Sequence, residues 1–382
     1  MTSPELAAPQ LDRPSASTQE SRLETDRQIT FDERQRGVLE RKEFFKPYKE
    51  EIKQLFHTLG KDDLWSEDPR EFVDYIVRNW AGGEHGNSPD KEQFTSEQIA
   101  AAKPILDKLR LHEEVRPPDG THYDDVVIVG GTTLANYRRV QFIQDLMMNH
   151  GIKADRITLW LGQRPRTERD GTNEEMLSPT GRFAGNDIKQ NPWVQEELKK
   201  PPHEQFATET ELGRVALLKA VPNGEKLMPK KVDAVGTEEN KPPERKFKNI
   251  PPRVDAAYHF EVPYQLPDGS THMQKFVIMN AEAVERPQGD PRHNTESSAK
   301  DWLREYAPPK GTGCKVLFIS GNPHTVRTAQ DTVHTMKAAG REDIALDIAG
   351  TSMAETVPIQ SALGEVAWLI FKDVEKNYPK AA

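Results

Sequence analysis

A histidine and an arginine near the start of one expected helix carry the clearest chemical signal in this sequence. The apolar run of residues 316–319 leads into Asn322, a good N-cap, and Pro323, which suits the first helical position. His324 and Arg327 then lie three residues apart on one face. Cations oppose the helix dipole at an N-terminus, so an anionic ligand explains this placement better than stability does. A solvated histidine and an arginine paired to a surface carboxylate form the structural alternative.

Two glycines and two threonines follow another apolar run, residues 126–129. Gly130 and Gly131 would let the backbone approach a ligand, and Thr132 and Thr133 offer hydroxyl groups. The segment is neither a GxGxxG motif nor a P-loop, because no Gly-Lys-Ser/Thr follows it. A purely structural turn is therefore an equal alternative.

Asn294, Thr295 and Glu296 open a third helix. Asn294 as N-cap and Glu296 as a favourable first-turn acid explain this segment without any ligand. Its functional interpretation depends on the other segments meeting it at one edge of a sheet, where helix N-termini bind anions.

An enzyme acting on a phosphorylated or nucleotide-like small molecule is the first functional hypothesis. His324 would act as general acid or base, oriented by Glu296 or Glu211. The expected ligand contacts are Gly130, Gly131, Thr132, Thr133, Arg164, Asn294, Thr295, Ser320, Gly321, Asn322 and Arg327. Arg164 and Arg327 would pair with the anion, because a planar guanidinium suits phosphate. Hydrolysis and group transfer remain equal alternatives.

Alternating strands and helices must position these residues. Strands are expected at 126–129, 156–162 and 315–321, with helices following at 134–150, 208–220 and 322–339. This order predicts an α/β fold with a mostly parallel sheet and helices on both faces. A hairpin is expected around the Pro-Asp-Gly turn that ends at Gly269, and it would extend the sheet.

Three regions are expected along the 382 residues. Residues 1–29 have the composition of a disordered tail, and residues 30–115 form a helical segment. Within it, Asp68 with Pro69 and Thr95 with Gln98 mark helix starts. Residues 120–382 form the α/β domain, with an insertion at about 221–285.

Composition excludes several classes of protein. The net charge of −9 and the lack of a basic stripe argue against nucleic-acid binding. No apolar run could cross a membrane or act as a secretory signal, so a cytoplasmic location is expected. The single cysteine, Cys314, is expected to be inert. Scattered histidines predict no dedicated metal site, although Mg²⁺ arriving with a phosphate ligand needs only one or two carboxylates.

The order of these motifs resembles the bacterial YdcF/SanA/ElyC family. The matching pieces are the strand and glycine turn of residues 126–131 with Arg138 or Arg139, the helix start at 294–299, and the strand and helix of 316–329. The acidic helix start at 208–214 lies between them. The resemblance covers about residues 124–340, without residues 221–285.

The resemblance implies a Rossmann-like three-layer α/β/α fold with its pocket at these turns. It also implies nucleotide-like ligands, including S-adenosylmethionine, or a role near cell-envelope lipid carriers. Two features depart from the family: residues 161–165 replace a Ser-Gly-Gly turn, and a polar tail replaces N-terminal membrane helices. The second hypothesis is a non-catalytic module of this fold that uses its N-terminal helices and hairpin insertion to bind a protein partner, as a secreted effector whose disordered tail is the export signal would.

Overall fold

A computed structural model describes residues 44–80, 94–234, 255–265, 269–284, 293–353 and 359–378. The expected tail, residues 1–29, lies outside these ranges, as do residues 235–254 of the charged stretch. Among the described residues, no helix combines the length and the apolar character needed to cross a membrane.

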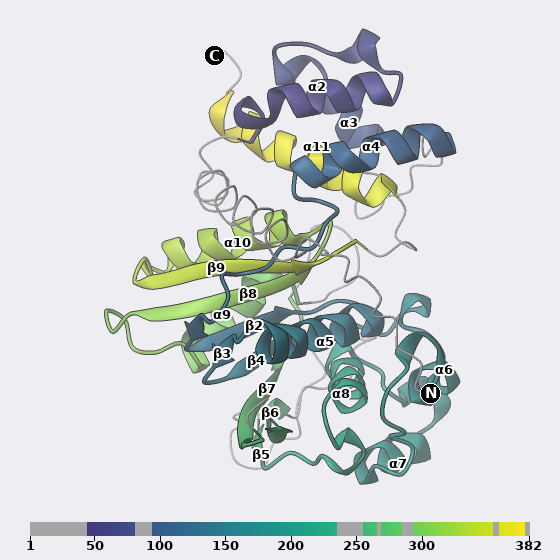
Figure 1. The fold of residues 1–382 in the computed structure, drawn as a ribbon, viewed down its shortest axis with the longest axis vertical. Coiled ribbons are helices and arrows are strands. Elements are labelled where there is room, and N and C mark those ends of the chain that lie inside the picture. The colour runs from purple at the N-terminus through teal and green to yellow at the C-terminus, as the bar shows by residue number, and fades with distance from the viewer. Residues whose placement is uncertain are drawn as a thin grey trace, which may run out of the picture.

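Seven strands form one twisted, mostly parallel sheet, which confirms the predicted α/β class (Figure 1). In spatial order they are β5 (Lys231–Ala234), β6 (Asp255–Gln265), β7 (Thr271–Ala281), β4 (Ile157–Gly162), β2 (Asp125–Val129), β8 (Cys314–Gly321) and β9 (Ile344–Thr351). The five strands from β7 to β9 run parallel, and β6 and β5 extend the sheet antiparallel. Two short strands, β1 (His122–Tyr123) and β3 (Lys153–Ala154), pair separately.

Helices cover both faces of the sheet, giving three layers. One face carries α5 (Thr133–Asn149) and α8 (Glu209–Ala220), and the other carries α9 (Thr295–Glu305) and α10 (Thr325–Ala338). The residues buried under the second pair include Trp160 and Trp302, whose ring centroids lie 5.9 Å apart. Aromatic side chains of this size bury large areas, so they anchor the α9 layer to the sheet.

The chain reverses its direction of travel across the sheet between β2 and β8. It runs from β2 to β4 and β7 on one side, and then returns to β8 and β9 on the other. The helix after β2, α5, therefore lies on one face, and the helix after β8, α10, lies on the opposite face. In open α/β sheets this reversal opens a crevice at the carboxyl ends of the two strands, and ligands bind there.

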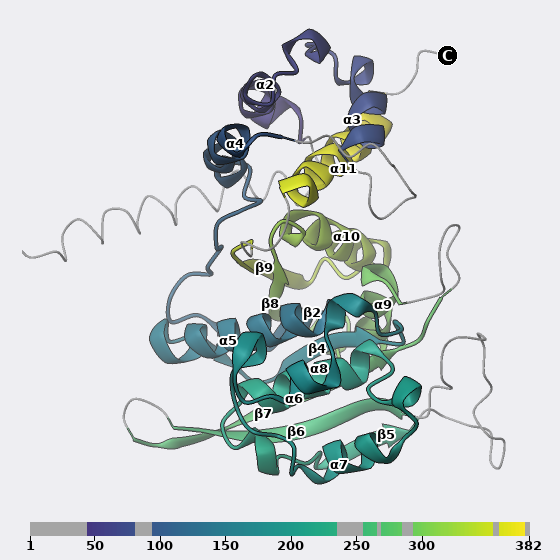
Figure 2. The same cartoon turned by 90° about the vertical axis from the view of Figure 1, so that its right-hand side faces the viewer.

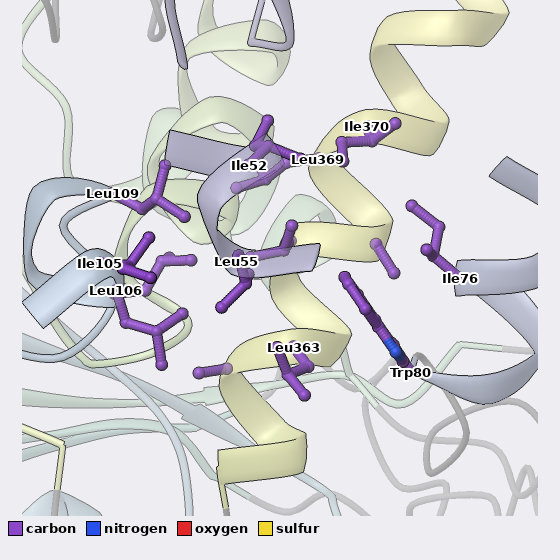
Figure 3. Packing of buried hydrophobic residues seen from close by; sticks show 14 of the residues in the cluster. Ile52, Leu55, Ile76, Trp80, Ile105, Leu106, Leu109, Leu363, Leu369 and Ile370 are labelled. Carbon is purple, nitrogen blue, oxygen red and sulfur yellow. The ribbon is translucent and has the colours of Figure 1, made fainter. Parts of the chain in front are cut away.

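Four helices build a separate unit above the sheet. They are α2 (Lys49–Thr58), α3 (Val73–Asn79), α4 (Ser96–Lys108) and α11 (Ile359–Asn377). Figure 3 shows Leu55, Ile76 and Leu106 of the first three helices packed around Leu363 and Ile370 of α11. The sequence pattern places α11 in the α/β domain, but in the structure the apolar face of α11 completes the helical unit instead. Figure 2 shows this unit joined to the sheet beside β9 and α10.

The predicted helix starts in this unit are present. Thr95 and Gln98 form a complete capping box on α4, and the Asp68 carboxylate accepts a hydrogen bond from the Arg70 backbone. Asp68 caps a short 3₁₀ turn, Pro69–Glu71, and α3 begins two residues after it. Both starts were predictable because capping depends on neighbours within three residues.

A long excursion leaves the sheet after β4 and returns at α8. It contains α6 (Asn173–Leu177) and α7 (Pro192–Lys199), neither of which the sequence pattern predicted. A bridge between Pro165 and Thr208 closes its neck, so the excursion begins and ends at the carboxyl edge of the sheet.

The expected insertion at 221–285 is partly a component of the sheet itself. The β6–β7 hairpin is present as predicted, and β7 pairs in parallel with β4 in the centre of the fold. Only β5, β6 and their connections are additions to the parallel sheet.

Candidate functional site

The turn after β2 leaves no room for a side chain at Gly130. A Cβ atom there would lie 2.7 Å from the Trp160 carbonyl oxygen and closer still to the carboxylate of Glu209. The first glycine of the predicted ligand turn thus makes space for a buried glutamate from the start of α8, which is 1% exposed.

We expect Gly130→Ala to destabilise the fold by about 1–3 kcal/mol, the usual range for overpacking. The backbone carbonyl of Trp160 cannot move without disturbing β4, so Glu209 must shift. Urea unfolding measures the change. Gly131→Ala is the matched control, since its nearest contacts are side-chain atoms at 3.1 Å. Equal stability of Gly130→Ala and wild type would contradict this packing.

The N-terminus of α5, a predicted anion site, already holds a carboxylate. Oδ1 of Asp170 accepts hydrogen bonds from the Thr133 backbone N–H at 3.0 Å and from Arg164 at 3.1 Å. Its Oδ2 accepts from the backbone and the hydroxyl of Thr167, at 2.8 and 2.9 Å. Asp170 is fully buried, and it comes from the excursion after β4. The protein therefore supplies its own anion at this helix terminus.

Arg164 joins this carboxylate to the one beside Gly130. Its Nε lies 3.4 Å from Glu209, and its NH2 also donates to the Gly131 carbonyl at 3.0 Å. Burial raises the pKa of Asp170, but the stronger combined effect of Arg164 and the backbone donors leaves that pKa below its usual value. The predicted ligand partner Arg164 is thus engaged by two internal carboxylates.

Glu209 also contacts a histidine that the sequence pattern did not single out. His293 Nε2 lies 3.1 Å from Glu209 Oε2, and both side chains are buried. Gly162, the last residue of β4, makes room for this ring, because a Cβ there would lie 2.8 Å from it. The sequence feature that could have identified His293 as a site residue is its position directly before the helix start at Asn294.

The turn after β8 differs from the prediction. The helix α10 begins at Thr325 with His324 as its N-cap residue, and Asn322 and Pro323 precede it, joined by a cis peptide bond. The backbone N–H of Asn322 instead continues the β8–β9 pairing, donating to Thr351 at 3.0 Å. No side chain caps this helix terminus within the described part of the chain.

His324 and Arg327 do lie on one face, and they share a carboxylate. His324 Nδ1 lies 2.7 Å from one oxygen of Glu365, and Arg327 Nε lies 2.9 Å from the other. Glu365 belongs to α11 and is 3% exposed. The anion that their placement at a helix start implies is therefore present as a side chain of the helical unit.

The acids expected to orient His324 have other contacts. Glu296 pairs with Lys300 at 2.6 Å on the surface of α9, and this hydrogen bond lowers its pKa. Glu211 accepts from the backbone of Thr208 at 2.7 Å in the capping box of α8, where burial raises its pKa. Glu365, which lies 41 residues from His324 in the chain, takes the expected role.

The other predicted contacts serve the local structure. Asn294 caps α9 through the backbone N–H of Ser297 at 2.8 Å, Thr295 is its first residue, and Thr132 caps α5 through Ala135 at 3.3 Å. Ser320 is buried within β8.

One buried cation at the chain reversal has no such partner. Arg139 of α5 is 6% exposed, and its NH1 donates to the carbonyls of Val129 and Gly130. Cβ atoms at Gly131 and Gly321 would lie 3.1 and 3.2 Å from its guanidinium, so it sits between the turns after β2 and β8. Among the described residues no carboxylate lies within ion-pair distance, and Nε is buried without an acceptor. Burial lowers its pKa to about 10, an effect that the negative charge of Glu209 partly opposes, so it stays charged at neutral pH.

Three more buried polar atoms around these turns have no partner in the described ranges. They are Oδ1 of Asn136, Oδ1 of Asn322 and Oγ1 of Thr325. Buried polar atoms are rarely left unsatisfied, and a bound water, ion or ligand is the usual reason. The crevice position at the β2–β8 reversal is therefore the candidate site.

Two further expectations concern reactive groups. Cys314 is buried at the start of β8, and burial raises the pKa of its thiol to about 11, so it is a poor nucleophile at neutral pH. Within the described ranges, no three His, Cys, Asp or Glu side chains gather closely enough to hold a metal ion.

No model of a known protein family matches the chain, and no curated protein matches it.

Proposed function

We propose that the protein binds an anionic small molecule, phosphorylated or nucleotide-like, at the carboxyl ends of β2 and β8. The proposal depends on the buried Arg139 guanidinium, which has no carboxylate within ion-pair distance among the described residues and feels Glu209 only from farther away. Burying a charge is costly unless an opposite charge or hydrogen bonds compensate it. An anionic ligand would supply that compensation.

The surroundings of Arg139 support an anion there. The α10 N-terminus begins four residues after β8 and carries no side-chain cap, so its N–H groups and dipole favour negative charge. The competing terminus, that of α5, is closed by Asp170. The likeness to the YdcF/SanA/ElyC family belongs to this proposal, with Arg139 rather than the exposed Arg138 as the matching arginine.

Catalysis at this site would use the buried pair of Glu209 and His293. Glu209 and Arg139 both contact the Gly130 turn, and a histidine oriented by a carboxylate is suited to general acid–base work. The family's nucleotide-like ligands and S-adenosylmethionine are therefore the first ligands to test, each with and without Mg²⁺.

We expect calorimetry to detect binding of AMP, S-adenosylmethionine or pyrophosphate to the wild-type chain. Arg139→Met should weaken that binding by about tenfold or more, the value of one or two charge-assisted hydrogen bonds. Arg138→Met, on the exposed neighbour, is the matched control and should bind like wild type. Arg139→Lys keeps the charge and provides a second folded variant, verified by circular dichroism.

The same titrations separate the two groups of cations. His324→Ala and Arg327→Ala should change affinity little, because Glu365 already pairs with both side chains. If affinity depends on these two residues and not on Arg139, the ligand binds at the contact between α10 and α11 instead. Absence of binding by every ligand would reject the proposed function.

The helical unit bears on the alternative, a module that binds proteins. Because α11 supplies its central helix, a chain lacking residues 1–123 would expose the apolar face of α11. Loss of a partner from that truncated chain would thus report misfolding as readily as a lost interface. Substitutions on the exposed surface of α2 or α4 are the better test of that alternative.

A further inference from the structure

Two of the unpartnered atoms near Arg139 require a donor, which a fully ionised phosphate group cannot supply. The side-chain amide of Asn136 donates to the Gly131 carbonyl at 3.3 Å, and that of Asn322 donates to the carbonyl of Glu113. These bonds orient both amides and leave each Oδ1 buried without a donor in the described part of the chain. A buried acceptor left unpaired is more costly than a hydrogen bond is stabilising.

The same region also has donors that require an acceptor. Arg139 Nε is buried without one, and the Thr325 hydroxyl at the start of α10 is 98% buried and equally unpartnered among the described residues. Arg139 contacts both Gly131 and Gly321, Asn136 bonds to Gly131, and Asn322 follows Gly321 in the chain. A ligand that carries both anionic oxygens and O–H groups would match both kinds of group.

We propose that the ligand is a phosphorylated polyol, with its phosphate between Arg139 and the N-terminus of α10 and its hydroxyls donating to Asn136 and Asn322. The inference rests on the proposed function and narrows it to a substrate class. Inorganic phosphate carries its one or two O–H groups on the phosphorus itself, too close to Arg139 to donate to both amides, and a neutral sugar lacks the negative charge that would pair with the guanidinium. A sugar phosphate satisfies both, and its binding requires no covalent step.

The site's neighbours agree with this assignment of roles. Arg164, the other guanidinium at this edge, is held by Asp170 and Glu209, so Arg139 is the cation available to a phosphate. Thr351 Oγ1 lies 3.1 Å from the position that a Cβ of Gly321 would take, which adds a hydroxyl group beside the guanidinium. Gly321 itself keeps this position clear of a side chain.

Calorimetry with ribose 5-phosphate, glucose 6-phosphate, inorganic phosphate and ribose tests the inference on the full chain. We expect at least one sugar phosphate to bind about tenfold more tightly than inorganic phosphate, with ribose binding weakest. Asn136→Ala should lower the affinity for the sugar phosphate about tenfold and leave that for inorganic phosphate unchanged. Asn149→Ala is the control, because Asn149 is an exposed asparagine at the C-terminal end of the same helix.

Three results would overturn the inference. If inorganic phosphate and both sugar phosphates bind equally, or if Asn136→Ala weakens all of them alike, the amide oxygens contact water and not ligand. Asn322→Ser provides a second variant should Asn136→Ala fail to fold. The third overturning result would be an Asn322→Ser variant that weakens binding of inorganic phosphate as much as binding of the sugar phosphate. These outcomes would contradict the sugar phosphate but not the anion site. Absence of any anion binding by the wild type would reject the proposed function as well.

Discussion

Asp170→Ala is expected to lower the free energy of unfolding by about 3–5 kcal/mol, the usual effect of removing one partner of a buried ion pair. The carboxylate is fully buried and accepts hydrogen bonds from Arg164, Thr133 and Thr167, so its removal leaves several donors without an acceptor. Arg164, whose side chain is 14% exposed, would keep its contact with Glu209. Urea unfolding followed by circular dichroism measures the loss.

A matched control and a rescue make this prediction specific. Glu168→Ala changes an exposed acid in the same 3₁₀ turn and should leave stability unchanged within about 0.5 kcal/mol. Formate or phosphate should restore part of the stability of Asp170→Ala, because the vacated position keeps a guanidinium and helix N–H groups. A variant as stable as wild type, or one that anions do not affect, would show that Asp170 is not a stand-in anion.

The pH dependence has a defined sign. The folded pKa of Asp170 lies below its usual value near 3.8, so the ionised carboxylate stabilises the fold above that pH. That contribution is lost as the pH falls below about 3.8 and the carboxylate takes up a proton. Wild type should therefore lose its advantage over Asp170→Ala in acid, whereas Glu168→Ala should follow wild type throughout.

The strands and helices of the α/β core were predictable because their signals are local. The apolar run before Gly130 and the run that ends at Gly321 each bury a strand on both faces, and such runs remain visible in the sequence. The position of α11 was not predictable. Its apolar face fits an α/β layer and a helical bundle equally well, and only packing decides between them.

The partners of the candidate site could not be predicted for the same reason. Spacing placed His324 and Arg327 on one face, but Glu365 reaches them from a helix of the other unit. The helix start at α8 contains Glu209 and Glu211, and only the fold shows that Glu209 faces the turn while Glu211 completes a cap. Likewise, adjacent arginines look equal in sequence, and only burial distinguishes Arg139 from Arg138.

A carboxylate of the chain lies at each helix terminus that looked ready for a ligand anion, but only Asp170 accepts hydrogen bonds from the helix backbone. Asp170 fills the one after β2, and Glu365 pairs with the cations at the one after β8. The two arrangements differ in accessibility. The Asp170 carboxylate is fully buried, whereas the His324 side chain is 43% exposed, so Glu365 joins two separate parts of the molecule at a solvated edge.

Glu365→Gln is expected to loosen the contact between α10 and the helical unit. The glutamine keeps the size of the side chain but loses the charge that pairs with His324 and Arg327, which we expect to cost about 2–4 kcal/mol. Hydrogen exchange should quicken at the amides of α11 and the first turn of α10, while those of β2 and β8 remain protected. Urea unfolding gives the total change.

Glu375→Gln is the control, since this acid lies on the exposed side of the same helix. Exchange that quickens equally in both variants would mean that α11 frays irrespective of Glu365. Exchange that quickens equally in β2 and β8 would mean that the helical unit and the sheet unfold together. Selective exchange in α11 would instead identify the Glu365 contact as weaker than the other attachments, which include the Lys372–Asp331 ion pair and the backbone pairing of Val115 with Gly350. Because that pairing needs no side chain, it should keep the unit attached beside β9 after the charge is removed.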